Sequence, residues 1–260
     1  MNKLIIKSAL FSALLGLATL NSTFAATDAV KSTEPVKSDT QKVLLDKKSK
    51  SAVQPANAPA NETLGASEFG AKSKTTVKDV VLSDSIRADI GGKSVELKRI
   101  TSGLRQKKVA LFWASVYVGQ VFTNAPVDFT SIEKLNASLN AGLPVVVTMT
   151  FVRDVPIDKI VDGYKEVFTA NGVKIDSEPY AKFLDAVKTS GDIKDKQTYY
   201  FTFAKSASGK NQMNFWTNGK ERFALNDASA AQIKDFFGMW FGKAVDSGLE
   251  QLQEQFLEHK

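Results

Sequence analysis

The spacing of hydrophobic residues changes along the chain and predicts strands in its first half. The longest apolar run falls within 103–120, where only Ser115 is polar between Val109 and Val118. A run of this length predicts a strand buried on both faces, with Arg105 standing just before it. Apolar residues at 86–90 and 94–97 flank Gly91-Gly92, which predicts a hairpin with a two-residue turn.

The second half of the chain alternates between helical and strand periods. Further strands are predicted at 77–82, 144–155, 198–203, 212–216 and 222–225, the last two joined by Asn218-Gly219. Apolar residues at helical spacing predict helices at 130–141, 156–171, 177–190, 227–241 and 246–258. Hairpin-joined strands with helices grouped late in the chain indicate an α+β fold, in which helices pack on one face of an antiparallel sheet.

Two segments precede this region and differ from it in composition. Residues 1–25 have a positive start, an apolar stretch and small residues before a cut after Ala25, which predicts a secretory signal. Export to the bacterial periplasm follows, with a retained membrane anchor as the alternative. Residues 26–75 are rich in Lys, Ser, Thr, Pro and Ala, so we expect a disordered tail, which could serve as a tether or a solubilising leader. The folded domain is predicted at 76–260.

Composition removes several kinds of chemistry. The chain has no cysteine and one histidine, His259, next to its last residue, so thiol chemistry is excluded and a Ser–His triad is not indicated. No aspartate-rich loop suggests a metal site, and we expect no cofactor. The net charge is +6, but most of it falls on residues 1–75, so no nucleic-acid partner is indicated.

Apolar and aromatic residues around one arginine are the candidate site. Arg105 is either a solvated side chain or a clamp for a carboxylate, because a guanidinium matches carboxylate geometry with two parallel hydrogen bonds. Tyr164 is either a core tyrosine or one whose hydroxyl enters a pocket. The aromatic cluster containing Phe237 and Trp240 either packs on the sheet or lines an apolar ligand site.

Five short motifs occur in order across 77–257. They are Gly103-Leu104-Arg105, Val116-Tyr117-Val118, Phe151-x-Arg153-Asp154-Val155, Asn218-Gly219-Lys220 and Trp240-Phe241-Gly242. In this order and spacing they resemble the chalcone isomerase-like family, in its bacterial secreted form. The resemblance implies an open-faced β-sandwich, a long antiparallel sheet with helices on one side and an apolar cleft between them.

The resemblance also implies what the cleft does. Isomerase members close a chalcone into a flavanone with an arginine, a threonine, a tyrosine and an asparagine. Arg105 matches the arginine, but the threonine position falls at Phe112 and the other two fall near Pro156 and Gly163. Non-catalytic members of the fold bind fatty acids, with the carboxylate held by this arginine.

The leading hypothesis is therefore a periplasmic, non-catalytic protein that binds a fatty acid or similar apolar carboxylate. The predicted ligand-binding residues are Arg105, Phe112, Tyr164, Phe237 and Trp240. One alternative is an intramolecular lyase on an unknown substrate, for which Tyr164 and Thr150 are the available donors. Another is a protein-interaction module with no ligand. No membrane span is expected once the signal is removed.

Overall fold

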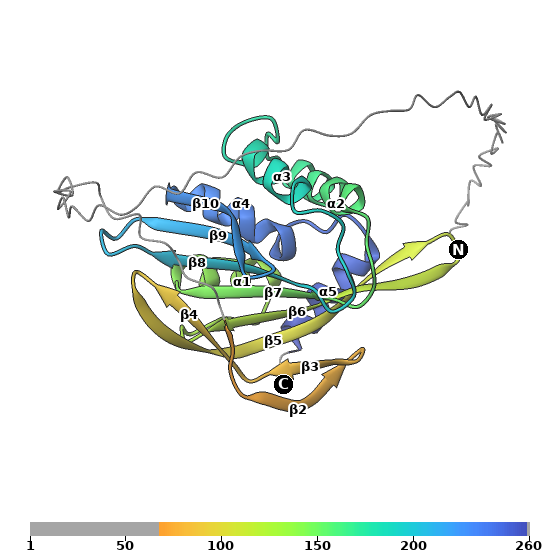
Figure 1. Cartoon of the computed structure of the whole chain (residues 1–260), viewed down its shortest axis with the longest axis horizontal. Helices are drawn as coiled ribbons and strands as arrows, with labels where there is room; N and C mark the ends of the chain where they lie inside the picture. Colours follow the sequence, from red (N-terminus) through yellow and green to blue (C-terminus); the bar gives the residue numbers. More distant parts are fainter. Residues whose placement is uncertain (1–67, 259–260) are drawn as a thin grey trace, which may run out of the picture. The chain divides into compact units, whose positions relative to one another are not determined.

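An eight-stranded antiparallel sheet is the centre of the computed structural model, which describes residues 68–258 (Figure 1). Its strand order is β1-β4-β5-β6-β7-β8-β9-β10, and β2 and β3 form a separate two-stranded sheet. The strands are β1 Glu68–Phe69, β2 Lys72–Val77, β3 Val80–Ser83, β4 Ser85–Ile90, β5 Lys93–Val109, β6 Phe112–Thr123, β7 Val145–Phe151, β8 Thr198–Lys205, β9 Asn211–Thr217 and β10 Lys220–Ala228. The helices are α1 Ile132–Ala141, α2 Ile157–Ala170, α3 Tyr180–Lys188, α4 Ala230–Phe241 and α5 Ser247–Leu257.

The main core lies between one face of this sheet and the helices. Tyr199, Phe201 and Phe203 alternate along β8 and all point toward the helices, where each is fully buried. All five helices contribute apolar side chains to the same core. The α+β class predicted from the sequence, with helices on one face of an antiparallel sheet, is confirmed.

The opposite face of the sheet is covered in part by the first strands. Ile86 and Ala88 of β4 belong to one hydrophobic cluster with Phe122 and Val146, while Leu82 of β3 belongs to another with Val118 of β6. Through Val146 the first of these clusters contributes to the burial of β7, every residue of which is buried.

The apolar run at 109–118 is a hairpin and not one buried strand. β5 extends to Val109, Ala110 and Leu111 form the turn, and β6 returns from Phe112. The tip is solvent-exposed, with Leu111 at 86% and Phe112 at 76% relative exposure. The prediction of a single strand was wrong here, and Arg105 lies inside β5 rather than before a strand.

Two other hairpins were predicted correctly. The folded region begins earlier in the chain than predicted. The turns at Gly91-Gly92 and Asn218-Gly219 have positive φ at all four residues, the backbone that such turn pairs favour. The segment 77–82 is itself a hairpin, β2 to β3, rather than one strand. β1 and most of β2 fall within 26–75, so folded structure begins before the predicted start at 76. The predicted signal at 1–25 and the rest of the tail lie outside the described residues.

Two glycines let α5 approach the sheet. Gly103 of β5 and Gly119 of β6 lie opposite each other, and α5 packs over them. A β-carbon at Gly103 would lie 2.8 Å from Cδ1 of Leu252 and 3.0 Å from Cβ of Gln255. The Gln255 side chain also accepts a hydrogen bond from the Leu104 N–H at 2.8 Å. The flat glycine surface therefore fixes the distance between α5 and β5.

We expect Gly103→Val to lower the free energy of unfolding by about 1–3 kcal/mol, because overpacking forces the helix off the strand. Gly163→Ala is the matched comparison, since a β-carbon there has no neighbour within 4 Å and glycine costs a helix interior about 0.5–1 kcal/mol. Urea unfolding should show opposite signs for the two variants. A Gly103→Val protein as stable as wild type would contradict this account of the α5 contact.

Candidate functional site

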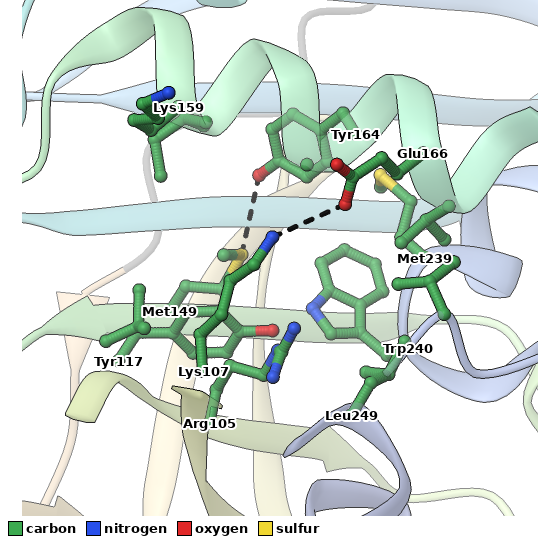
Figure 2. Close-up of a pocket in the computed structure, with 15 residues that line it drawn as sticks. Arg105, Lys107, Tyr117, Met149, Lys159, Tyr164, Glu166, Met239, Trp240 and Leu249 are labelled. Carbon is green, nitrogen blue, oxygen red and sulfur yellow. Dashed lines mark hydrogen bonds and ion pairs between the residues drawn. The ribbon is translucent and has the colours of Figure 1, made fainter. Parts of the chain in front are cut away.

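A small apolar pocket lies where α2, α4 and α5 meet the central strands (Figure 2). Its volume is about 100 Å³. The walls are formed mainly by apolar and aromatic side chains, and charged side chains from β5 and α2 also line it. The lining residues are Arg105, Lys107, Val116, Tyr117, Met149, Lys159, Ile160, Gly163, Tyr164, Glu166, Val167, Met239, Trp240, Val245 and Leu249.

Strand periodicity explains how β5 presents its cations to this pocket. Arg105 and Lys107 are two residues apart, so their side chains emerge on the same face of the strand. Both line the pocket, and Lys107 forms an ion pair with Glu166 of α2 at 3.4 Å. The Lys107–Glu166 pair is half exposed and lies across the pocket, while the Arg105 side chain retains 11% exposure.

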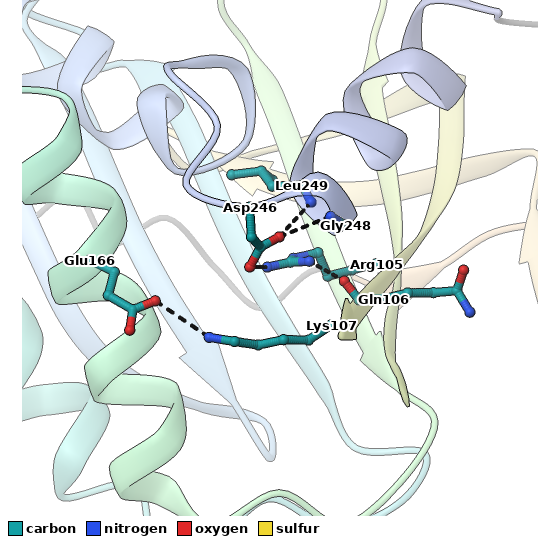
Figure 3. A network of polar contacts seen from close by, with 7 residues as sticks. All are labelled: Arg105, Gln106, Lys107, Glu166, Asp246, Gly248 and Leu249. Carbon is teal, nitrogen blue, oxygen red and sulfur yellow. Dashed lines mark hydrogen bonds and ion pairs between the residues drawn. The ribbon is translucent and has the colours of Figure 1, made fainter. Parts of the chain in front are cut away.

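Arg105 has a carboxylate partner within the chain (Figure 3). Its Nη2 donates to Oδ2 of Asp246 at 2.7 Å, and its Nη1 donates to the carbonyl oxygen of Gln106. Asp246 is the N-cap of α5, because Oδ1 accepts from the N–H groups of Gly248 and Leu249 at 3.0 and 2.9 Å. The arginine is thus neither solvated nor unpaired. It is held in place by the first turn of α5.

The two pocket tyrosines stay protonated over the ordinary pH range. Burial raises the pKa of Tyr117 to about 12, although nearby Arg105 and a hydrogen bond with the Trp240 side chain act in the opposite direction. Burial, with smaller effects of Tyr199 and Tyr117, raises the pKa of Tyr164 well above its usual value. The Tyr164 hydroxyl donates to Sδ of Met149 at 3.5 Å, a weak acceptor. Both hydroxyl groups can therefore serve as hydrogen-bond donors but not as bases.

Three of the five predicted ligand-binding residues share this pocket, and two do not. Arg105, Tyr164 and Trp240 line it. Phe112 does not, because the turn at Ala110-Leu111 carries it to the exposed hairpin tip. Phe237 is fully buried on another side of α4, with its ring 4.2 Å from that of Phe203. Phe112 and Phe237 therefore do not line this pocket with the other three, and the ligand-binding role of all five residues stays a prediction.

Sequence reasoning missed several residues of the pocket. Lys107, Glu166, Met149 and Met239 were not predicted to line it. The two-residue spacing of Arg105 and Lys107 could have indicated the cations, had β5 been recognised as beginning ahead of Arg105. The methionines carry no comparable signal, because an apolar residue in a core element reads the same with or without a pocket beside it.

Of the two donors proposed for a lyase reaction, Tyr164 lines the pocket and Thr150 does not. The Thr150 hydroxyl forms a hydrogen bond with that of Thr198 at 3.0 Å and is not part of the pocket lining.

Other candidate sites have less support. Within residues 68–258, no group of three or more His, Asp or Glu side chains could hold a metal ion. A wider groove of about 850 Å³ runs between α1 and α4, but many of its lining residues are polar or charged, including Glu133, Asn136 and Lys234.

Fold and pocket together define an α+β domain with an apolar pocket between sheet and helices and a paired arginine in its wall. No family model matches the chain, and no curated protein does. Among solved structures, a fatty-acid binding protein of Arabidopsis thaliana is similar over 65% of this chain and 93% of its own, with 17% identity and a TM-score of 0.42. Similarity at this level assigns neither a ligand nor a family to the chain.

Proposed function

We propose that this domain binds an amphiphile with an apolar body and a carboxylate head, such as a fatty acid. The observation that carries the proposal is the position of Arg105, a mostly buried guanidinium in the wall of an otherwise apolar pocket. A guanidinium has five N–H donors, and its hydrogen bonds to Asp246 and Gln106 leave some of them for a second acceptor. Lys107 adds a second cation on the same strand face.

The size of the pocket sets a condition on the ligand. Pockets that hold small molecules usually measure about 300–1,000 Å³, and this one measures about 100 Å³. Its present volume holds a short chain segment, so a long-chain acid requires the pocket to widen. Met149 and Met239 are suited to this, because an unbranched thioether side chain changes rotamer readily. Affinity should therefore depend on chain length.

The test is a calorimetric titration of the full chain with fatty acids of increasing length and with the matching alcohols. We expect Arg105→Gln to weaken acid binding roughly 10- to 100-fold while alcohol binding changes little, because only the carboxylate forms charge-assisted hydrogen bonds. Arg99→Gln is the control, since Arg99 is also on β5, has a 14% exposed side chain and forms an ion pair with Asp84 away from the pocket. Equal acid binding by wild type and Arg105→Gln would contradict the proposal.

A second variant tests the same idea in the opposite direction. Asp246→Asn removes the carboxylate that now holds Arg105 and keeps a side-chain oxygen for the cap of α5. We expect this variant to bind fatty acids several-fold more tightly than wild type, because the ligand no longer competes with an internal carboxylate. Weaker acid binding by Asp246→Asn would mean that Arg105 acts only as a structural partner of α5.

The proposal also includes the fold family, the absence of catalysis and the cellular location of the protein. The ordered motifs, together with the sheet and its helix layer, support a non-catalytic member of the chalcone isomerase-like fold. A lyase has less support, since of its two predicted donors only Tyr164 lines the pocket, while Thr150 is hydrogen-bonded to Thr198 outside it. Export to the periplasm is inferred from the sequence of residues 1–25, and cell fractionation with a tagged chain tests it.

A further inference from the structure

A two-stranded arm projects from the sheet at the end of β5 and β6 (Figure 1). β4 pairs with β5 only as far as Lys98, and β7 pairs with β6 only from Tyr117 onward. Between these limits, residues 106–115 pair only with each other, from Gln106 opposite Ser115 to Val109 opposite Phe112. We call residues 106–115 the arm and residues 109–113 its tip.

The tip is the main exposed apolar feature of the described residues. Relative exposure is 59% for Val109, 86% for Leu111, 76% for Phe112 and 42% for Trp113. The only other exposed large hydrophobic residue between 68 and 258 is Val81. Large exposed apolar side chains grouped at one point usually mark a surface that binds a partner. The tip therefore has the character of a binding surface that nothing among residues 68–258 covers.

Both faces of the arm are apolar at the tip and cationic behind it. Residues opposite each other in a ladder share a face, and successive residues alternate. Phe112 therefore projects with Val109 and Lys107 on the pocket side, while Trp113 projects with Lys108 on the other side. Lys107 and Lys108 are both exposed, and Lys108 has no ion-pair partner among residues 68–258. One lysine thus stands behind each aromatic ring.

This arrangement favours a lipid surface over a protein groove. A groove on a protein would cover one face or one edge of the ladder, whereas the rings here leave on both faces at the same level. Tryptophan is enriched at membrane interfaces, and lysines extend their charged ends toward the head groups while their stems stay on apolar surface. Positive charge behind the tip is complementary to anionic lipids.

The length of the arm also fits a lipid surface. Lys108 and Ala110, at the turn, are two positions apart, which is about 7 Å of strand, and interfacial segments bury their apolar side about 5–10 Å deep. The outer edges of the two strands keep backbone N–H and C=O groups that need water or head groups, so the arm cannot enter the hydrocarbon core. No helix among residues 68–258 is long and apolar enough to cross a membrane.

We propose that the 109–113 tip inserts into the head-group region of an anionic lipid membrane and docks the domain there. The inference does not rest on the ligand proposed above, because it uses only the arm. It has a consequence for the pocket nonetheless. Lys107 belongs to both the arm and the pocket lining, so a docked arm places one wall of the pocket beside the membrane surface.

The experiment uses the full chain and phosphatidylcholine vesicles with and without phosphatidylglycerol. Because residues 1–25 are themselves apolar, the main readout is quenching of Trp113 fluorescence by brominated lipid, supported by co-sedimentation. We expect quenching in wild type that disappears in Trp113→Phe, a variant that keeps an apolar ring at the tip and so still binds. Equal quenching in wild type and Trp113→Phe would overturn the proposal.

Two further variants and a control measure how much the tip and Lys108 contribute to vesicle binding. Leu111→Ser with Phe112→Ser should reduce Trp113 quenching and lower arm-dependent partitioning roughly 100-fold, if each side chain gives up about half of its transfer free energy. Lys108→Ala should lower partitioning about fivefold on phosphatidylglycerol vesicles and leave it unchanged on phosphatidylcholine alone. Val81→Ser, which removes an exposed valine away from the arm, should change neither.

Two outcomes would assign the tip differently. Unchanged Trp113 quenching in the Leu111→Ser, Phe112→Ser variant would show that the tip does not carry the binding. A wild-type dimer in sedimentation velocity that becomes a monomer in the same variant, with no vesicle binding, would assign the tip to a second copy of the chain. Either result overturns membrane docking by the tip.

Discussion

Phe183→Ala should lower the free energy of unfolding by about 4 kcal/mol, the middle of the range for a phenylalanine removed from a packed core. Phe183 lies on α3, is fully buried and packs at the centre of the aromatic core. Its ring centroid lies 5.3–6.2 Å from those of Tyr164, Phe168, Phe201, Phe215, Phe223 and Phe236. These neighbours belong to two other helices and three strands, so the cavity cannot close by moving one element.

Phe112→Ala is the matched control, because it makes the same chemical change at a side chain with 76% relative exposure. We expect its effect to stay within about 0.5 kcal/mol, as for other surface substitutions. Urea unfolding of both variants, followed by circular dichroism, provides the comparison. Similar losses in the two variants would mean that the hairpin tip packs against the domain or that the core around α3 is loose.

These two phenylalanines also show where sequence reasoning succeeds and where it fails. Phe183 belongs to a helix whose apolar residues repeat at helical spacing, so its burial follows from the pattern. Phe112 sits in an apolar run that reads as a buried strand, yet the run turns back on itself at Ala110-Leu111. Neither turn residue is a Gly, Asn, Asp or Pro, and Ala110 has a φ of +54°. The usual turn signal is therefore missing from this sequence.

The pocket likewise could be predicted from the sequence only in part. Arg105 was identified through the family resemblance and strand position, and it does line the pocket. Its partner Asp246 is 141 residues away, and no local pattern connects the two. Asp246 could be recognised as a helix start, but its contact with Arg105 depends on how α5 packs on β5. Pairings between distant elements are set by tertiary packing, which a single sequence does not display.

The contact between Asp246 and Arg105 leads to the second large expected effect. Asp246→Ala should lower the free energy of unfolding by about 2 kcal/mol, with about half from the lost N-cap and the rest from a guanidinium left without its carboxylate. Asp246→Asn should cost less, since asparagine is also a good N-cap. Urea unfolding at neutral pH provides the measurement. Equal losses of stability in Asp246→Ala and Asp246→Asn would assign the whole effect to the ion pair.

Acid should remove the advantage of Asp246 over asparagine. Burial alone would raise the pKa of Asp246, but hydrogen bonds from Arg105 and the Leu249 N–H, with the charges of Arg105 and Lys107, outweigh it and lower that pKa. A lowered pKa means that the ionised carboxylate favours the folded state. Its contribution is therefore complete above the unfolded value of about 3.9 and is lost as the pH falls through the folded pKa.

The stability difference between wild type and Asp246→Asn should thus be constant near neutral pH and shrink as the pH falls below about 4. Asp154→Asn is the control, because Asp154 also accepts a backbone N–H and pairs with Lys194, but its side chain is 64% exposed. Its stability difference should be much smaller at every pH, since water and salt screen an exposed pair. If the stability difference between wild type and Asp246→Asn did not change with pH, the charge on Asp246 would not be what holds α5 against β5.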